Sequence, residues 1–207
     1  MSYLCRINHP SLLSDMESSI KTKENVFIID FPFLNFLIKD LSHFLEGELK
    51  REMPVPDLAS LISIFAADAG LTCGNNEVDV FFAYDDTDKA QLEATSMNIT
   101  DIEDVGGFIC PIGNFQFQSA PTGGFTSVTD LFLELTHIAC KQSNASRIFV
   151  LGNFSEYGNA IGEILKEAKE KETVEFRLDN PDKIFNHQSR VAMFPIMQFL
   201  GVKPEEV

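Results

Sequence analysis

The sequence contains no tryptophan and only three tyrosines, although it has 19 phenylalanines. Surfaces that stack sugars or bases usually draw on Trp and Tyr, so this composition gives no sign of such a surface. The phenylalanines fall mostly inside apolar runs, where packing in a core is their expected use. With 207 residues, 44% of them apolar, the chain can bury a sizeable core as one domain.

Basic residues are also scarce. Sixteen Lys and Arg against 31 Asp and Glu give a formal net charge of −15, and the bases are scattered among acids. A phosphate backbone is repelled by such a surface unless a basic patch is set aside for it. We therefore expect nucleic acid to be a disfavoured partner and the acidity to serve solubility.

The patterns that mark common cofactor sites and membrane segments are missing as well. The four cysteines form no Cys-x-x-Cys pair and the four histidines are scattered along the chain, so zinc is not expected. No glycine-rich nucleotide loop is present. No apolar stretch nears the ~20 residues of a membrane span, and no charged-then-apolar leader opens the chain. These absences predict a cytoplasmic protein without a membrane partner.

Short apolar runs alternate with amphipathic segments along the chain, which is typical of a parallel sheet covered by helices. The sequence predicts an α/β fold with a doubly wound, mainly parallel sheet flanked by helices on both faces. Gly113-Asn114, before an alternating run, predicts the turn of a small inserted hairpin. Strands are expected at 26–29, 78–84, 108–110, 148–151 and, as an edge strand, 174–178, with the first and fourth adjacent.

The helices are expected from apolar residues that recur at helical spacing. Helices are predicted at 34–45, closed by Gly47; at 58–69, capped by Asp57 and closed by Gly70; from Ser127 onward; and at 160–168. The stretch 192–200 is too apolar to remain in water, so we expect it to pack on the domain or on a second copy.

Polar side chains gather where the predicted strands end, and ligands bind at the carboxyl ends of parallel strands. Carboxylates brought together there could hold Mg²⁺ or Mn²⁺. The simpler interpretation is that most of them cap helices or lie in solvated turns. Asp30 directly ends the most buried strand, so both interpretations stay open for it. The other residues of this set are Asp85, Asp86, Asp88, Ser127, Asp130, Asn153, Ser155 and Glu156.

This order of elements resembles the PIN-like nucleases, in particular their NYN branch. In that branch the first strand ends in Asp, a Lys-Gly-x-Asp segment opens a long helix, and a later strand leads into Ser-Gly-Asp-Ser-Asp. The corresponding segments here are Ile28-Ile29-Asp30, the Gly-Gly-Phe-Thr-Ser run at 123–127, and the Gly-Asn-Phe-Ser-Glu-Tyr run at 152–157. The resemblance spans residues 26–178.

The departures from this pattern concern the acids. Asp30 stands where the family has its first acid, but Thr126 and Asn153 stand where the family has the next two. The family's second Asp after this strand corresponds to Phe154, Ser155 or Glu156 here. Two-metal phosphodiester cleavage relies on clustered carboxylates, so two neutral replacements should severely weaken metal binding. The resemblance therefore implies a member that kept the fold and lost the chemistry.

These considerations predict an arm at 1–24, a PIN-like α/β domain at 25–179 and a C-terminal tail at 180–207 that packs on the domain or on a second copy. We expect a non-catalytic binding or assembly module without a cofactor, with Asp30, Asn153 and Glu156 as the matching cleft positions. Its partner would be a second copy (a homodimer) or another protein. The alternative is a residual metal-dependent phosphodiesterase, ribonuclease-like, with Mg²⁺ or Mn²⁺ on Asp30, Asp86, Asp130 and Glu156.

Overall fold

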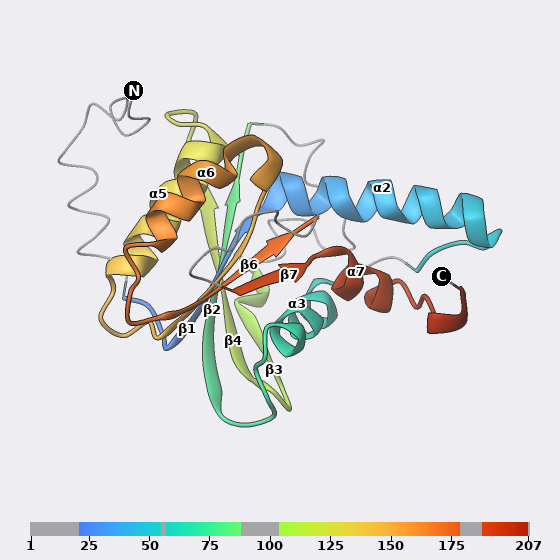
Figure 1. Cartoon of the computed structure of the whole chain (residues 1–207), viewed down its shortest axis with the longest axis horizontal. Helices are drawn as coiled ribbons and strands as arrows, with labels where there is room; N and C mark the ends of the chain where they lie inside the picture. The colour runs from blue at the N-terminus through green and yellow to red at the C-terminus, as the bar shows by residue number, and fades with distance from the viewer. Residues whose placement is uncertain (1–20, 55–56, 88–103, 179–187, 207) are drawn as a thin grey trace.

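The computed structural model describes residues 21–54, 57–87, 104–178 and 188–206. These residues form one seven-stranded sheet in the order β3-β4-β2-β1-β5-β6-β7, together with five α-helices (Figure 1). The strands are β1 Asn25–Asp30, β2 Asn76–Tyr84, β3 Gly107–Cys110, β4 Gly113–Pro121, β5 Arg147–Leu151, β6 Glu172–Arg177 and β7 Gln188–Val191. The helices are α2 Phe31–Leu49, α3 Leu58–Asp68, α5 Val128–Lys141, α6 Phe154–Leu165 and α7 Met193–Phe199.

The sheet is mainly parallel, as predicted. β1 lies between β2 and β5 and pairs with both in parallel. The pairs β2–β4, β5–β6 and β6–β7 are parallel too, whereas β3 and β4 form an antiparallel hairpin. The prediction that the first and fourth expected strands are parallel neighbours is therefore confirmed.

The order of the parallel strands reverses next to β1. The chain moves outward from β1 through β2 to β4, and then returns to β5 on the other side of β1 before continuing to β6 and β7. A crevice outside the carboxyl ends of the strands, at such a reversal, is where ligands bind in open α/β sheets. The carboxyl ends of β1 and β5 lie at this reversal, so a ligand site is expected there.

Two hydrophobic clusters share the strands of the sheet. All six residues of β1 are buried, as expected for a central strand. Phe27 and Ile29 belong to a cluster with residues of α2, α3 and α7. Val26 and Ile28 belong to a second cluster with residues of α5 and α6. Successive side chains of a strand point to opposite faces, so the two clusters meet β1 from opposite sides.

Several boundaries differ from the sequence-based predictions. α2 begins directly after β1 and runs through Gly47 to Leu49, so the predicted stop at Gly47 is wrong. The chain instead leaves α2 at Lys50, which adopts the left-handed conformation (φ 52°). α3 begins after Asp57, as predicted, and the Asp57 side chain accepts a hydrogen bond from Ser60 N.

The hairpin is larger than predicted, and its turn lies earlier. Cys110 pairs with Gly113, so the turn is at 111–112, and Gly113-Asn114 is already part of β4. β4 continues to Pro121 and pairs with β2 along its whole length. The strand predicted at 174–178 was expected at an edge, but β6 lies inside the sheet because β7 pairs with it.

The described part of the predicted tail packs on the body of the domain. β7 joins the sheet, and Ala192, Ile196 and Leu200, each at most 1% exposed, belong to the cluster that contains α2 and α3. Met193 and Phe194 remain 38% and 63% exposed. Residues 1–20 of the predicted arm lie outside the described residues.

Candidate functional site

Asp30 ends β1 and caps α2. Its Oδ1 accepts a hydrogen bond of 3.0 Å from Phe33 N, which satisfies one of the free N–H groups at the start of the helix. Pro32 occupies the first turn, where a missing N–H costs nothing. The Asp30 side chain is only 5% exposed, so this cap is buried.

Tyr157 of α6 reaches the same carboxylate. Its hydroxyl donates a hydrogen bond to Asp30 Oδ2 and accepts one of 2.7 Å from Asn153 N. The ring is buried, at 7% exposure, and lies against Phe132 of α5 with their ring centroids 5.7 Å apart. The Asp30–Tyr157 contact therefore joins β1 and the start of α2 to α6, across the point where the strand order reverses.

Local geometry at the end of β5 makes room for this contact. A Cβ atom at Gly152 would lie 2.8 Å from the Tyr157 hydroxyl and 2.9 Å from the Phe132 ring, both far inside normal contact distance. Tyr157 itself departs from helical geometry, with φ −126° and ψ 16°, so α6 is kinked there. Gly152 and this kink together allow the tyrosine hydroxyl to lie at the carboxyl ends of β1 and β5.

Burial and charge shift the acidity of both partners. Desolvation raises the pKa of Asp30 above its ordinary value of 3.8, and the nearby negative charge of Glu156 raises it further. The hydrogen bonds from Tyr157 and Phe33 act in the opposite direction but do not cancel the desolvation. Burial, and then the Asp30 charge, raise the pKa of Tyr157, so its hydroxyl stays protonated and remains a donor.

Asn153 and Glu156 lie beside this contact and bind each other. Asn153 Nδ2 donates a hydrogen bond of 3.2 Å to Glu156 Oε2, and Glu156 is exposed. Asn153 occupies the N-cap position of α6, but its side chain makes no capping hydrogen bond. The structure thus brings the three predicted cleft residues Asp30, Asn153 and Glu156 to one place, with Tyr157 between them.

Asp86 belongs to a different group, formed by the loops after β2 and β4. Its Oδ1 accepts hydrogen bonds from Gly123 N at 2.9 Å and from Thr122 Oγ1 at 3.2 Å. Asp85 Oδ1 accepts from Thr87 N at 2.9 Å and forms a local turn. The Asp86 carboxylate therefore binds the donors of the Thr122-Gly123 turn before α5.

Asp130 forms the cap of α5 with Ser127, as the simpler interpretation predicted. Ser127 Oγ accepts a hydrogen bond of 3.0 Å from Asp130 N and donates one of 2.8 Å to Asp130 Oδ2. Ser155 lies within the first turn of α6 rather than at its cap. Asp88 is outside the described residues.

The four acids of the predicted metal site thus have separate local partners. Asp30 binds Phe33 N and Tyr157, and Glu156 binds Asn153. Asp86 binds the Thr122-Gly123 turn, and Asp130 binds Ser127. In the described part of the chain, no three His, Cys, Asp or Glu side chains are grouped so that they could hold a metal ion.

Tyr157 is the site residue that the sequence analysis did not single out. The buried face of α6 carries Phe154, Tyr157, Ile161 and Leu165. The sequence pattern therefore already indicated a tyrosine hydroxyl on an apolar helix face. A buried tyrosine hydroxyl normally finds a hydrogen-bond partner. The nearest strand end, at Asp30, supplies an acceptor. The adjacency of β1 and β5 was predicted, but the contact also needs the space at Gly152 and the kink of α6 at Tyr157.

Residues 19–207 match a family of unknown function, DUF6621. The chain belongs to the DUF6621 family. Neither the curated proteins nor the solved structures contain a match to this DUF6621 chain. The match covers all seven strands and five helices described above, and both residues of the Asp30–Tyr157 contact lie within it. None of the described helices of this DUF6621 protein is long and apolar enough to cross a membrane.

Proposed function

We propose that this chain is a non-catalytic PIN-like module that binds or assembles with a second copy of itself or with another protein. In this module, the acid that ends the first strand has become part of a structural latch. The observation that carries the proposal is that both oxygens of the Asp30 carboxylate are engaged by the protein. Oδ1 accepts from Phe33 N and Oδ2 accepts from the Tyr157 hydroxyl. We call this set of contacts the Asp30–Tyr157 latch.

The arrangement of the sheet supports the PIN-like part of the proposal. β1 and β5 are parallel neighbours, and their carboxyl ends carry Asp30 and the Gly152-Asn153 turn, as the resemblance implies. Two hydrophobic clusters meet β1 from opposite sides, which supports a doubly wound fold with helices on both faces.

The chemistry at the latch supports the non-catalytic part. A catalytic Mg²⁺ or Mn²⁺ needs exposed carboxylate oxygens with space for water and substrate. Asp30 is 5% exposed, and neutral Thr126 and Asn153 stand where the resemblance places acids. Arg177, at the carboxyl end of β6, binds Glu175 at 2.8 Å and packs over the Phe154 ring, so its charge serves the fold.

A cleavage assay tests the proposal. Single-stranded RNA is incubated with the full chain and Mg²⁺ or Mn²⁺, in parallel with the variants Asp30→Asn and Asp57→Asn. We expect no metal-dependent cleavage by any of the three proteins. Asp57 is a matched control because it is also an aspartate N-cap, on α3, and its Oδ2 accepts from Ser60 N at 3.1 Å.

The same assay decides the alternative of a residual phosphodiesterase. That alternative is favoured by one observation: Glu156 is close enough to Asp30 to raise its pKa. Asp30 and Glu156 would then be the first two metal ligands. Metal-dependent cleavage that Asp30→Asn and Glu156→Gln abolish, but that Asp57→Asn leaves intact, overturns the non-catalytic proposal.

A further inference from the structure

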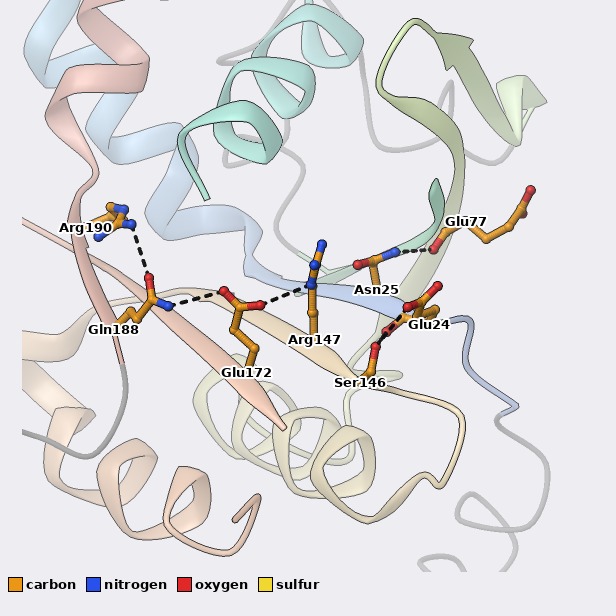
Figure 2. A network of polar contacts seen from close by, with 8 residues as sticks. All are labelled: Glu24, Asn25, Glu77, Ser146, Arg147, Glu172, Gln188 and Arg190. Carbon is orange, nitrogen blue, oxygen red and sulfur yellow. Dashed lines mark hydrogen bonds and ion pairs between the residues drawn. The ribbon is translucent and has the colours of Figure 1, made fainter. Parts of the chain in front are cut away.

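The two edges of the sheet differ in how they are protected. At the β7 edge, a chain of polar contacts runs across the starts of three strands (Figure 2). Arg147 Nε lies 3.1 Å from Glu172 Oε2, Gln188 Nε2 donates to Glu172 Oε1 at 3.2 Å, and Arg190 Nη2 donates to Gln188 Oε1 at 3.1 Å. Charged side chains on an edge strand discourage pairing with another chain. The β7 edge is guarded in this way.

The β3 edge has no such guard. β3 consists of Gly107, Phe108, Ile109 and Cys110, without a charged residue or a proline. The Ile109 side chain is 83% exposed, which makes it one of the most exposed large apolar side chains that the structure describes. The whole segment 105–129 contains no Asp, Glu, Lys or Arg, in a chain whose net charge is −15.

The outer edge of β3 offers free backbone groups. Gly106 O accepts from Phe117 N at 3.0 Å, and in an antiparallel pair the hydrogen-bonded residues alternate with residues that are not hydrogen-bonded to the partner. The register then makes Phe108 and Cys110 the residues bonded to β4. The N–H and C=O groups of Gly107 and Ile109 therefore point away from β4, and no other strand among the described residues pairs with β3.

The packing of β3 against β4 requires glycine at position 107. A Cβ atom there would lie 2.1 Å from Phe115 O of β4, so a side chain is not tolerated at this position. On the same part of the surface lies an open pocket of about 400 Å³, lined by Gly107, Ile109, Asn114, Gln116 and Lys23 among others. An apolar side chain that approaches Gly107 from outside meets bare backbone and this pocket.

We propose that the β3 edge pairs antiparallel with β3 of a second copy of this chain, around a two-fold axis at Phe108. In that register, Gly107 of each copy lies opposite Ile109 of the other, and each such pair exchanges both N–H···O bonds. The Ile109 side chain of one copy then lies beside Gly107 of the other. The interface is self-complementary, as two-fold symmetry requires.

Self-complementarity favours a second copy as the occupant, because an identical strand places Ile109 opposite Gly107 on both sides of the axis. Two chains that each carry a net charge of −15 repel wherever acidic surfaces meet. β3 and its partner strand β4 carry no charged side chain, so two copies that meet along this edge avoid direct contact between acidic side chains of these strands. β3 is short, so the association is expected to be weak and to strengthen with salt, which screens the remaining repulsion.

Sedimentation velocity of the full chain over a wide range of concentration, combined with amide hydrogen exchange, tests the proposal. We expect a monomer–dimer equilibrium, with slower exchange at Gly107 and Ile109 as the concentration rises. Ile109→Lys should weaken dimerisation about tenfold or more, because it places like charges across the axis. Phe125→Lys is the matched control: Phe125 is 97% exposed, follows the end of β4 that does not pair with β3, and gives the same change of charge.

Each outcome of this experiment either supports or overturns the proposed dimer. None of them depends on whether the site at Asp30 has catalytic activity. A concentration-dependent dimer that Ile109→Lys weakens and Phe125→Lys preserves supports the proposal. A chain that stays monomeric at every concentration overturns it. A dimer without protection of Gly107 and Ile109, or one that both lysine variants weaken equally, also overturns it.

Discussion

At the scale of single residues, the Tyr157 hydroxyl serves two partners at once. It donates to Asp30 and accepts from Asn153 N, and the side chains of Tyr157 and Asp30 are only 7% and 5% exposed. Tyr157→Phe keeps the ring but leaves the buried Asp30 carboxylate and the partly buried Asn153 N–H each short of a partner. We expect a loss of about 1–3 kcal/mol in the free energy of unfolding, measured by urea denaturation. The double variant with Asp30→Asn should lose less than the sum of the two single variants, because the two residues form one contact. Strict additivity would contradict the latch.

Asp30 also predicts a pH dependence of stability. Its pKa in the folded protein is raised, so the folded state holds the proton more tightly than the unfolded state does. The stabilising contribution is complete below the ordinary pKa of 3.8 and is lost as the pH rises through the raised pKa of the folded state. The stability of the parent chain relative to Asp30→Asn should therefore fall as the pH rises through this window. Urea midpoints of both proteins at several pH values measure this, and a difference that stays constant or grows with pH contradicts it.

At the scale of elements, the sequence was sufficient to predict features that depend only on residues within or next to a single strand or helix. The buried run before Asp30, the cap at Asp57 and the cap at Ser127 were all predicted correctly. The start of α2 was missed, although Asp30 followed by Pro32 is a common N-cap pattern. Gly47 was taken as a stop because glycine often ends a helix, but no Cβ contact or positive φ requires glycine there.

The elements that were missed depend on neighbours that are distant in sequence. β4 pairs with β2 along nine residues. This pairing extends β4 well beyond the alternating run that the sequence showed. β7 is a four-residue strand with an ordinary polar sequence, and only its pairing with β6 defines it. Asp30 and Tyr157 are 127 residues apart, and although the adjacency of β1 and β5 was predicted, their contact also depends on the space at Gly152 and on the kink of α6 at Tyr157, which no local motif indicates.

At the scale of the whole molecule, the C-terminal region belongs to the same structure as the sheet. α7 packs against α3, and Ala192 N donates to Arg177 O where the chain leaves β7. In Figure 1 this region closes one side of the domain, next to the far part of α2. Arg51, just beyond α2, donates to Gly201 O at 3.0 Å and lies 3.3 Å from Glu206 Oε2.

Truncation separates the role of α7 from that of the last residues. Removing residues 188–207 deletes β7 and the buried side chains of Ala192, Ile196 and Leu200, and burying an Ile or Leu side chain is worth about 1.5–3 kcal/mol. We expect a loss of several kcal/mol from these side chains and from the core surface they leave behind, comparable with the whole stability of a typical domain. The truncated chain should therefore aggregate or melt far below the parent. A chain that ends at Val202 is the control: it keeps α7 and loses only a partly exposed ion pair, worth at most about 1 kcal/mol. Circular dichroism melting curves of the three proteins measure the difference. If the chain that lacks residues 188–207 melts with the parent, the C-terminal region is not part of the folded core.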